Sequence, residues 1–329
     1  MTKIAIVGGG LAGTCLAKLF TENGDDIHWY SDNQSAASHI SSGILNPITG
    51  RRYALAWRYD ELLNIAKEFY GNYLTPIRLE KHFSPFNNEV SIDEVIHGKE
   101  KYLSKINDEW IEVKESYQLQ TNAFIENTKL KLKNSDNIVT NSFNHSLLKF
   151  SNNQWHYQSE IYDQIFFAEG IQVKKNPFFC HLPFQPNRGE ALIVNIPDDK
   201  PDAVRKHGKF ICPHGEHFWL GSSFDKVDMG APLLTEKAKL EMINAIPNLV
   251  HHVAYQIMDH IGALRSTTPD RRPIIGEHPS HKGLFLFNGF GTKGASLIPW
   301  CSLQLFKLLK NNESLPIEIS IDRLKKFTK

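Results

Sequence analysis

The sequence predicts an α/β fold, α+β overall, in which a parallel sheet flanked by helices is combined with a second, mostly antiparallel β domain. Three observations predict this architecture. A short apolar run, Lys3 to Val7, leads into a glycine-rich turn and a helical pattern. Strand-like runs follow one another in the second half, at Arg188–Asn195 and Phe210–Phe224. From Gly283 onwards the chain returns to a strand followed by a helix.

The first thirty residues carry a specific local pattern. Gly8, Gly10 and Gly13 form a G-x-G-x-x-G directly after the first strand, a helix is expected over Thr14–Asn23, and a second strand over Ile27–Tyr30. The first glycine permits the tight turn, the second lets a pyrophosphate approach the backbone, and the third lets the helix pack close to the sheet. The helix N-terminus offers free N–H groups to an anion. This pattern predicts a Rossmann-like dinucleotide-binding unit.

The end of the second strand departs from the usual pattern. An acidic residue normally stands there and holds the ribose hydroxyls. Counted from Gly13, that place falls on Ser31, and Asp32 follows one residue later. Either Asp32 serves after a small shift, or the ribose is held in another way.

Three further segments decide which dinucleotide is expected. Ser41–Arg52 reads SSGILNPITGRR, Gly262–Gly276 reads GALRSTTPDRRPIIG, and Gly283–Trp300 reads GLFLFNGFGTKGASLIPW. Together with the N-terminal glycines, these segments resemble the D-amino-acid oxidase and glycine oxidase family of FAD-dependent oxidoreductases. Within it, the likeness is closest to the FAD-dependent oxidase half of the bifunctional tRNA 5-methylaminomethyl-uridine biosynthesis enzyme. The resemblance covers both ends of the chain and hardly touches residues 75–160.

The resemblance implies non-covalent FAD and a divided chain. The sarcosine oxidase branch attaches its flavin through a cysteine two residues before the position of Arg265, and here that place is Ala263. A discontinuous FAD-binding domain would be completed by a mostly antiparallel β substrate domain. The FAD-binding domain is expected at residues 1–75, 140–185 and 263–329, and the substrate domain at residues 76–139 and 186–262.

The same resemblance implies the cofactor-binding residues. Backbone and a serine hydroxyl of the loop Ser41–Leu45 would lie along the flavin and its pyrophosphate. The helix after Gly289 would aim its N-terminus at the flavin N1–C2=O edge, which becomes anionic on reduction. Lys293 either adds a charge there or is simply solvated. The expected cofactor-binding residues are Gly8, Gly10, Leu11, Ala12, Gly13, Ser31, Asp32, Ser41, Ser42, Gly43, Ile44, Leu45, Ala168, Gly170, Gly291, Thr292, Lys293 and Gly294.

Arg265 is the expected catalytic residue. It follows a predicted strand at Gln256–Ala263. By resemblance, it forms a bidentate pair with a substrate carboxylate, a task that suits the rigid, permanently charged guanidinium fork. The alternative is a structural pair with an acid such as Asp270. No metal site is expected, because His214 and His217 lie between two strand-like runs and indicate a hairpin turn.

The resemblance implies an FAD-dependent amine or amino-acid oxidase or dehydrogenase acting on CH–NH or CH–NH2 donors. It would pass a hydride from the carbon beside the nitrogen of a small-molecule substrate to flavin N5. One alternative is oxidation of a carboxymethylaminomethyl group on the wobble uridine of tRNA, which would make tRNA a partner. Another is a non-catalytic flavin-binding or electron-transfer subunit.

Bulk composition narrows these choices. The 37 basic and 36 acidic residues nearly cancel, which argues against a general nucleic-acid coat protein and weakens the tRNA alternative. Four scattered cysteines predict reduced, mostly buried thiols. No convincing run of about 18 apolar residues is present, so no membrane contact is expected. The sequence therefore predicts a cytoplasmic protein.

Overall fold

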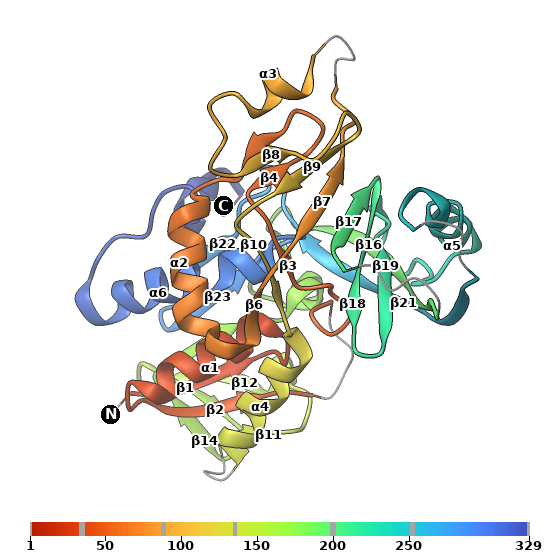
Figure 1. Ribbon diagram of the computed structural model, residues 1–329. Coiled ribbons are helices and arrows are strands. Elements are labelled where there is room, and N and C mark those ends of the chain that lie inside the picture. Colours follow the sequence, from red (N-terminus) through yellow and green to blue (C-terminus); the bar gives the residue numbers. More distant parts are fainter. Residues whose placement is uncertain are drawn as a thin grey trace.

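A computed structural model describes residues 2–32, 37–86, 90–133, 137–197, 202–250 and 254–327. The chain forms two large sheets (Figure 1). One takes its strands from residues 3–30, 138–167 and 274–288, and the other takes them from residues 79–113 and 185–267. The first sheet has six strands. In spatial order they are β11 (Ile138–Val139), β2 (Asp26–Tyr30), β1 (Lys3–Val7), β15 (Gln164–Phe167), β23 (Leu284–Asn288) and β22 (Ile274–Glu277). All neighbours pair in parallel except β22, which runs antiparallel to β23 at the edge.

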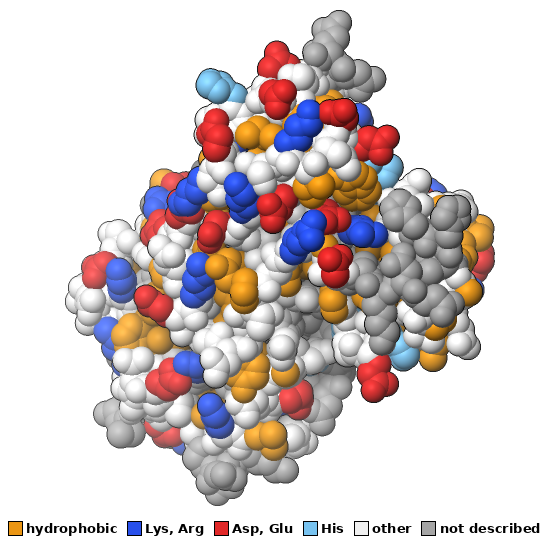
Figure 2. All heavy atoms as spheres, in the orientation of Figure 1, with side chains coloured by type: hydrophobic (Ala, Val, Ile, Leu, Met, Phe, Trp, Pro, Cys, Tyr) orange, Lys and Arg blue, Asp and Glu red, His pale blue; other side chains and the backbone are white. Residues whose placement is uncertain are grey.

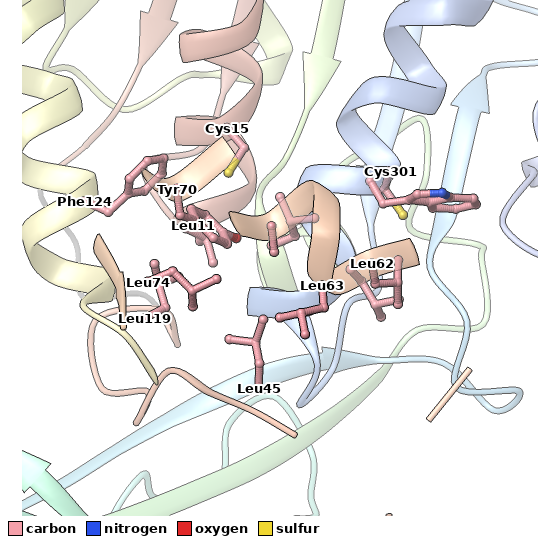
Figure 3. Close-up of a cluster of buried hydrophobic side chains, with 14 of the residues drawn as sticks. Leu11, Cys15, Leu45, Leu62, Leu63, Tyr70, Leu74, Leu119, Phe124 and Cys301 are labelled. Atoms are coloured by element: carbon pink, nitrogen blue, oxygen red, sulfur yellow. The ribbon is translucent and has the colours of Figure 1, made fainter. Parts of the chain in front are cut away.

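Helices cover one face of the six-stranded sheet. Alternate strand residues such as Ile4, Ile6 and Phe166 point into this layer and are almost fully buried. Figure 3 shows part of the contact, where Leu11 and Cys15 lie near Tyr70 and Phe124 from neighbouring helices. The helices in this core are α1 (Leu11–Glu22), α2 (Tyr59–Tyr70), α4 (Thr121–Lys133) and α6 (Gly294–Asn311).

The opposite face of the same sheet packs against a small antiparallel sheet. Ala5 and Val7 of β1 point to this side and share a buried cluster with Trp155 and Tyr157. Strand residues alternate between the two faces, so the near-continuous apolar run of β1 is buried on both sides. The small sheet comprises β12 (Leu148–Ser151), β13 (Gln154–Tyr157) and β14 (Glu160–Tyr162).

The second large sheet has nine strands and is mostly antiparallel. Its strands are β20 (Asp225–Lys226), β16 (Gln185–Asn195), β19 (His217–Gly221), β18 (Lys209–His214), β17 (Val204–His207), β7 (Leu79–His82), β9 (Trp110–Val113) and β8 (Leu103–Lys105), and β21 (Gln256–Thr267) also pairs with β16. Helix α5 (Glu236–Ile243) covers one face, where Leu192, Val194 and Met242 form a separate core. The expected hairpin between His214 and His217 is confirmed, because these residues pair at the turn of β18 and β19.

The remaining elements are short. They are β3 (Ile44–Leu45), β4 (Ile48–Thr49), β5 (Ala54–Leu55), β6 (Leu74–Ile77), α3 (Ile92–Ile96), β10 (Ser116–Leu119) and the 3-10 turns Gly71–Tyr73, His145–Leu147, Gly170–Lys175, Ile246–Asn248 and Ile321–Phe327. Among the described residues, no helix combines the length and apolar character that crossing a bilayer needs. Three cysteines, Cys15, Cys212 and Cys301, are buried free thiols as expected, and Cys180 is half-buried.

Two features of the chain path differ from the expectations. The strand expected to end at Ala263 continues to Thr267, so Arg265 lies inside β21 and does not follow it. The extension arises because β16 is itself eleven residues long and pairs with β21 along its whole length. In addition, β11 pairs with β2 and α4 packs on α1, so residues 121–133 and 138–139 lie with the six-stranded sheet. The division into domains remains a prediction.

Candidate cofactor and substrate cavity

A large cavity, with a volume of about 1510 Å³, lies between the two large sheets. One end is lined by the glycine turn after β1 and by Asp32 after β2. The other end is lined by one face of the nine-stranded sheet, including Arg265, and the first residues of α6 border the cavity as well. The fold therefore brings segments from both ends and the middle of the chain to one space.

The backbone of the glycine turn packs directly against the backbone of neighbouring segments. Gly8 has φ +125°, a value that L side chains rarely adopt, and a Cβ there would overlap the carbonyl oxygen of Ala168. A Cβ on Gly13 would overlap the carbonyl oxygen of Gly8. Only glycine lets β1, α1 and the end of β15 approach in this way. The N–H of Leu11, at the start of α1, donates to Ser38 Oγ at 3.0 Å.

Two polar residues at the end of β2, Ser31 and Asp32, were expected to contact the ribose, and only one of them lines the cavity. Ser31 is buried behind the turn, where a Cβ on Gly9 would overlap its Oγ, and it does not line the cavity. Its Oγ has no hydrogen-bond partner among the described residues. Asp32 lines the cavity, and its Oδ2 accepts from Ser142 Oγ at 3.1 Å. Asp32 is therefore the residue that reaches the cavity at this position.

Glu169 acts as an anchor for the turn that follows β15. Its carboxylate lies 2.7 Å from His145 Nε2 and accepts from Asn176 Nδ2 at 2.8 Å. The next residue, Gly170, has its carbonyl held by Asn288 Nδ2 at 2.8 Å. These contacts fix the backbone that faces the glycine turn, which explains a charged residue between Ala168 and Gly170.

The cradle fits the pyrophosphate end of a dinucleotide. Three of its glycines stand where a side chain would collide with backbone or with Ser31, and the N-terminus of α1 borders the opening. Helix N-termini and close glycine backbone are the features that pyrophosphate binding requires. Among the described residues, no group of three or more His, Cys, Asp or Glu side chains is arranged to hold a metal ion.

Neutral groups hold Arg265 in place. Its Nη1 donates to Asn187 Oδ1 at 3.0 Å and to the Ser223 carbonyl at 3.2 Å, and its Nη2 donates to Ser222 Oγ at 2.8 Å. Asp270, the acid considered as a structural partner, pairs instead with Arg323 at 3.0 Å. Arg265 therefore carries a charge that no described acid neutralises through a salt bridge.

The guanidinium of Arg265 lies over the backbone of Gly189. A Cβ at Gly189 would overlap the guanidinium, so this glycine provides the space that the group occupies. Burial lowers the pKa of Arg265 to about 10, and the nearby Asp225 carboxylate partly opposes this shift. The group stays protonated at neutral pH. A guanidinium has five N–H donors, and the three hydrogen bonds leave two of them for a ligand.

The start of α6 adds positive charge to the cavity. Lys293 is the N-cap residue, and Gly291, Thr292 and Gly294 line the cavity beside it. Burial lowers the pKa of Lys293, and repulsion by Arg272 and Arg271 lowers it further. The partial positive charge of a helix N-terminus adds to these cations.

Nearly all the expected cofactor residues meet at the cavity. Only Gly13 and Ser31 do not line it, the first because it packs α1 against β1 and the second because it lies behind Gly9. Sequence reasoning missed Ser38, Ser142 and His145, which reach the cavity from poorly patterned loops. It also missed Asn187, Gly189, Ser222 and Lys206, which only the pairing of strands brings beside the cavity.

Comparisons with known proteins agree with this geometry. The profile of a family described as FAD dependent oxidoreductase matches residues 139–308. A glycine oxidase of Pseudomonas putida is 30% identical over 132 residues, which cover 38% of this chain and 34% of that protein. A tRNA 5-methylaminomethyl-2-thiouridine biosynthesis bifunctional protein of a Caulobacter species is 26% identical over 121 residues, 36% of this chain and 20% of that protein.

The chain therefore matches about a third or less of the length of these curated relatives. Among solved structures, glycine oxidase from Bacillus cereus is similar with a TM-score of 0.74 at 16% identity, covering 98% of both chains. At that identity the likeness shows a shared fold.

Proposed function

Because the chain belongs to the family of FAD-dependent oxidoreductases, we propose that it oxidises the C–N bond of an amino acid or a secondary amine that carries a carboxylate. The observation that carries this proposal is Arg265. Its guanidinium faces the same cavity as the glycine turn and has no salt-bridge partner among the described acids. A buried, unneutralised guanidinium is a site for a carboxylate.

The proposed cofactor contacts divide along the cavity. Gly8 and Gly10 would admit the pyrophosphate at the N-terminus of α1, and Asp32 would receive the ribose. Residues of the 41–45 loop and of the α6 N-terminus would border the flavin. Bound FAD supplies a two-electron acceptor for the substrate hydride. Because Ala263 replaces the attachment cysteine, FAD would be held without a covalent bond through that position.

Arg265 would orient the substrate. Its two free N–H groups match the two oxygens of a carboxylate, which fixes the direction of the bond from the carboxylate to the amine-bearing carbon. Asn187 and Ser222 would keep the fork from rotating, since each already accepts from it. Holding the reacting carbon in one position makes its reaction with the flavin effectively unimolecular, which lowers the entropic part of the barrier.

The wobble uridine of tRNA is a second candidate substrate, supported by the charge of the cavity. Seven basic side chains line it against three acidic ones, although the whole chain carries a net charge of only +1. None of the seven forms a salt bridge with an acid in the described part of the chain. They are Lys175, Lys206, Lys226, Arg265, Arg271, Arg272 and Lys293. On the outer face seen in Figure 2, by contrast, basic and acidic side chains are interspersed.

The proposed reaction is tested by anaerobic titration. Purified protein reconstituted with FAD should lose its oxidised flavin absorbance when glycine, sarcosine or D-alanine is added without oxygen. Unchanged absorbance with the whole panel, in protein that retains FAD, would remove the small-amine reaction.

The tRNA candidate has its own test. Mobility-shift titrations with unmodified tRNA should give an affinity that falls steeply as salt rises, because phosphate contacts release counterions. The absence of binding at low salt would exclude this candidate without affecting the first.

A further inference from the structure

We propose that Lys206 forms a second anion site in the substrate cavity, so that the substrate is an extended amine with a carboxylate at Arg265 and a phosphate group at Lys206. This inference rests on the proposed amine oxidation and narrows its substrate class. It stands on three observations: the two cations share one face of one sheet, they are too far apart for a small amino acid, and Lys206 has no acidic partner in the described chain.

The strand register places both cations on the same face. Lys206 pairs with Phe210, Phe210 with Gly221, Gly221 with Ala191, and Ala191 with Ile261. Directly paired residues point to the same side of a sheet, and so do residues four apart along a strand. Arg265 is four residues from Ile261, so it shares this face, and the cavity lining includes both Lys206 and Arg265.

The spacing excludes a single small substrate that touches both groups. The Arg265 guanidinium lies over Gly189 of β16, which is three strand pairings from β17 and two residues from Ala191, the residue of β16 in line with Lys206. This corresponds to roughly 14 Å across the strands and about 7 Å along them. Even with the Lys206 side chain extended towards Arg265, the carboxylate and ammonium of one small amino acid are too close together to reach both groups. The same distance argues against Lys206 as the base for the reacting amine, which must lie next to the carboxylate at Arg265.

The residues around Lys206 favour the binding of an anionic ligand. Its Nζ lies 3.7 Å from the centre of the Phe210 ring, and its strand partner across β7 is another lysine, Lys81. Lys81 is 7% exposed, and its Nζ donates to the Gly50 carbonyl at 3.0 Å. Burial lowers the pKa of Lys206 to about 8, and repulsion by Lys209 adds to this effect. A phosphate would offset both the desolvation and the repulsion, and lysine binds phosphate as a compact point charge.

A series of matched compounds tests the site. N-carboxymethyl-aminoalkyl phosphates with linkers of increasing length are compared with the corresponding alcohols, using FAD-loaded protein and anaerobic flavin reduction. Beyond a threshold length, the phosphate should lower the concentration for half-maximal reduction by at least about tenfold relative to its alcohol. Equal values for phosphate and alcohol at every length would overturn the proposal.

Variants locate the effect at Lys206. Lys206→Gln should abolish the difference in half-maximal concentration between each phosphate and its alcohol, whereas Lys206→Arg should retain most of it. The control is Lys237→Gln, which removes an exposed lysine on α5 outside the cavity and should leave the difference unchanged. A phosphate effect that survives in a folded, FAD-containing Lys206→Gln protein would place the anion elsewhere. The wild-type comparison needs no variant, so it stands even if Lys206→Gln does not fold.

The readout separates this inference from the proposed function. If no alcohol or phosphate reduces the flavin, amine oxidation fails, and the phosphate site is still measured through the change in flavin absorbance on binding. Unmodified tRNA added as a competitor identifies the source of the phosphate. Competition with the phosphate compounds indicates a nucleic-acid phosphate, whereas its absence indicates a small phosphorylated metabolite.

Discussion

At the level of single residues, Arg265 depends on neighbours that carry no charge. Asn187, Ser222 and the Ser223 carbonyl take three of its N–H groups, and Gly189 leaves room for the guanidinium. An acidic partner in the same place would neutralise the group and leave it unavailable for the proposed substrate carboxylate. The residue types around Arg265 therefore keep it both fixed and available.

Arg265→Met should weaken carboxylate binding while leaving FAD in place. Loss of a buried, bidentate charge interaction corresponds to a fall in kcat/KM on the order of 10²-fold or more. The measurement is steady-state kinetics on whichever amine reduces the wild-type flavin, with the flavin spectrum as a check of cofactor content. A kcat/KM within a few-fold of wild type would show that the carboxylate binds elsewhere.

Gly189→Ala tests the position of the same guanidinium. The added methyl group would displace the guanidinium, so kcat/KM should fall although Arg265 is intact. Gly230→Ala is the matched control, since a Cβ there meets no atom within contact distance although Gly230 also lines the cavity. Equal activity of the two variants would contradict the role given to Gly189.

The buried Lys81 should make the free energy of unfolding depend on pH. Burial lowers its pKa to about 7 from the ordinary 10.5, and repulsion by Lys206 adds to the shift. Between pH 7 and pH 10.5 the Lys81 side chain is protonated in the unfolded chain but largely neutral in the folded chain. The free energy of unfolding therefore rises with pH across this window. Below it, Lys81 is charged in both states, and the full cost of burying the charged ammonium lowers the stability of the folded protein. Lys81→Met should therefore be more stable than wild type near pH 7, with a difference that shrinks towards pH 10.

Urea unfolding at several pH values measures this difference. Lys237→Met, at an exposed position on α5, serves as the control and should follow the wild-type profile. A Lys81→Met advantage that stays constant with pH would mean that Lys81 is charged in the folded protein.

At the level of elements, the approach of α1 to β1 and β15 depends on two glycines. Gly13 meets the carbonyl of Gly8, and Gly8 meets the carbonyl of Ala168, so one chain of backbone contacts joins the helix to two strands. The N-terminus of α1 is aimed at the cavity only while this spacing holds. The close contact would thus couple packing to the proposed binding of the cofactor pyrophosphate.

Gly13→Ala should lower both stability and FAD affinity. Forcing a methyl group into a packed contact costs about 1–3 kcal/mol, and the shift of α1 would move the N–H groups at its start. Thermal unfolding of the apoprotein and fluorescence titration with FAD measure the two effects, with Gly230→Ala again as the control. An unchanged FAD affinity would contradict this prediction, because it would show that FAD binding does not depend on the position of α1.

At the level of the whole molecule, the cavity is shared between the two large sheets. Its lining includes residues of the glycine turn and the 41–45 loop, of the turn after β15, of β16, β17 and β21, and of the start of α6. A ligand that contacts all of these segments binds only when both sheets are in place. Folding of the two sheets and cofactor binding should therefore be linked.

FAD should raise the unfolding temperature of the protein as its concentration increases. At 100 times the dissociation constant, a ligand that binds only the folded state adds about 2.7 kcal/mol of stability. Calorimetry of apoprotein at several FAD concentrations measures the shift, and the Gly13→Ala variant should show a smaller one. Two transitions, of which only one responds to FAD, would indicate sheets that unfold independently.

Local patterns in the sequence were enough to predict the elements at the two ends of the chain. The strand Lys3–Val7 is observed with the predicted bounds. A helix follows the glycine turn as expected, but it spans Leu11–Glu22 and not Thr14–Asn23, because it begins inside the glycine motif. Short-range sterics and hydrophobic periodicity determine these elements. The resemblance of four motifs further supplied the family, and it gave the prediction that Arg265 is the catalytic residue. The polar region between residues 90 and 135 gave no clear pattern, since its short strands are stabilised by pairing with distant partners.

The sequence alone therefore determined the dinucleotide-binding unit and the family, because glycine conformation and strand–turn–helix order are local properties. Only the tertiary structure decided that β21 extends past Arg265, that Asn187 and Ser222 hold its guanidinium, and that Lys206 reaches the same cavity. Those relations depend on which strands become neighbours, and strand pairing joins residues that are far apart in the chain.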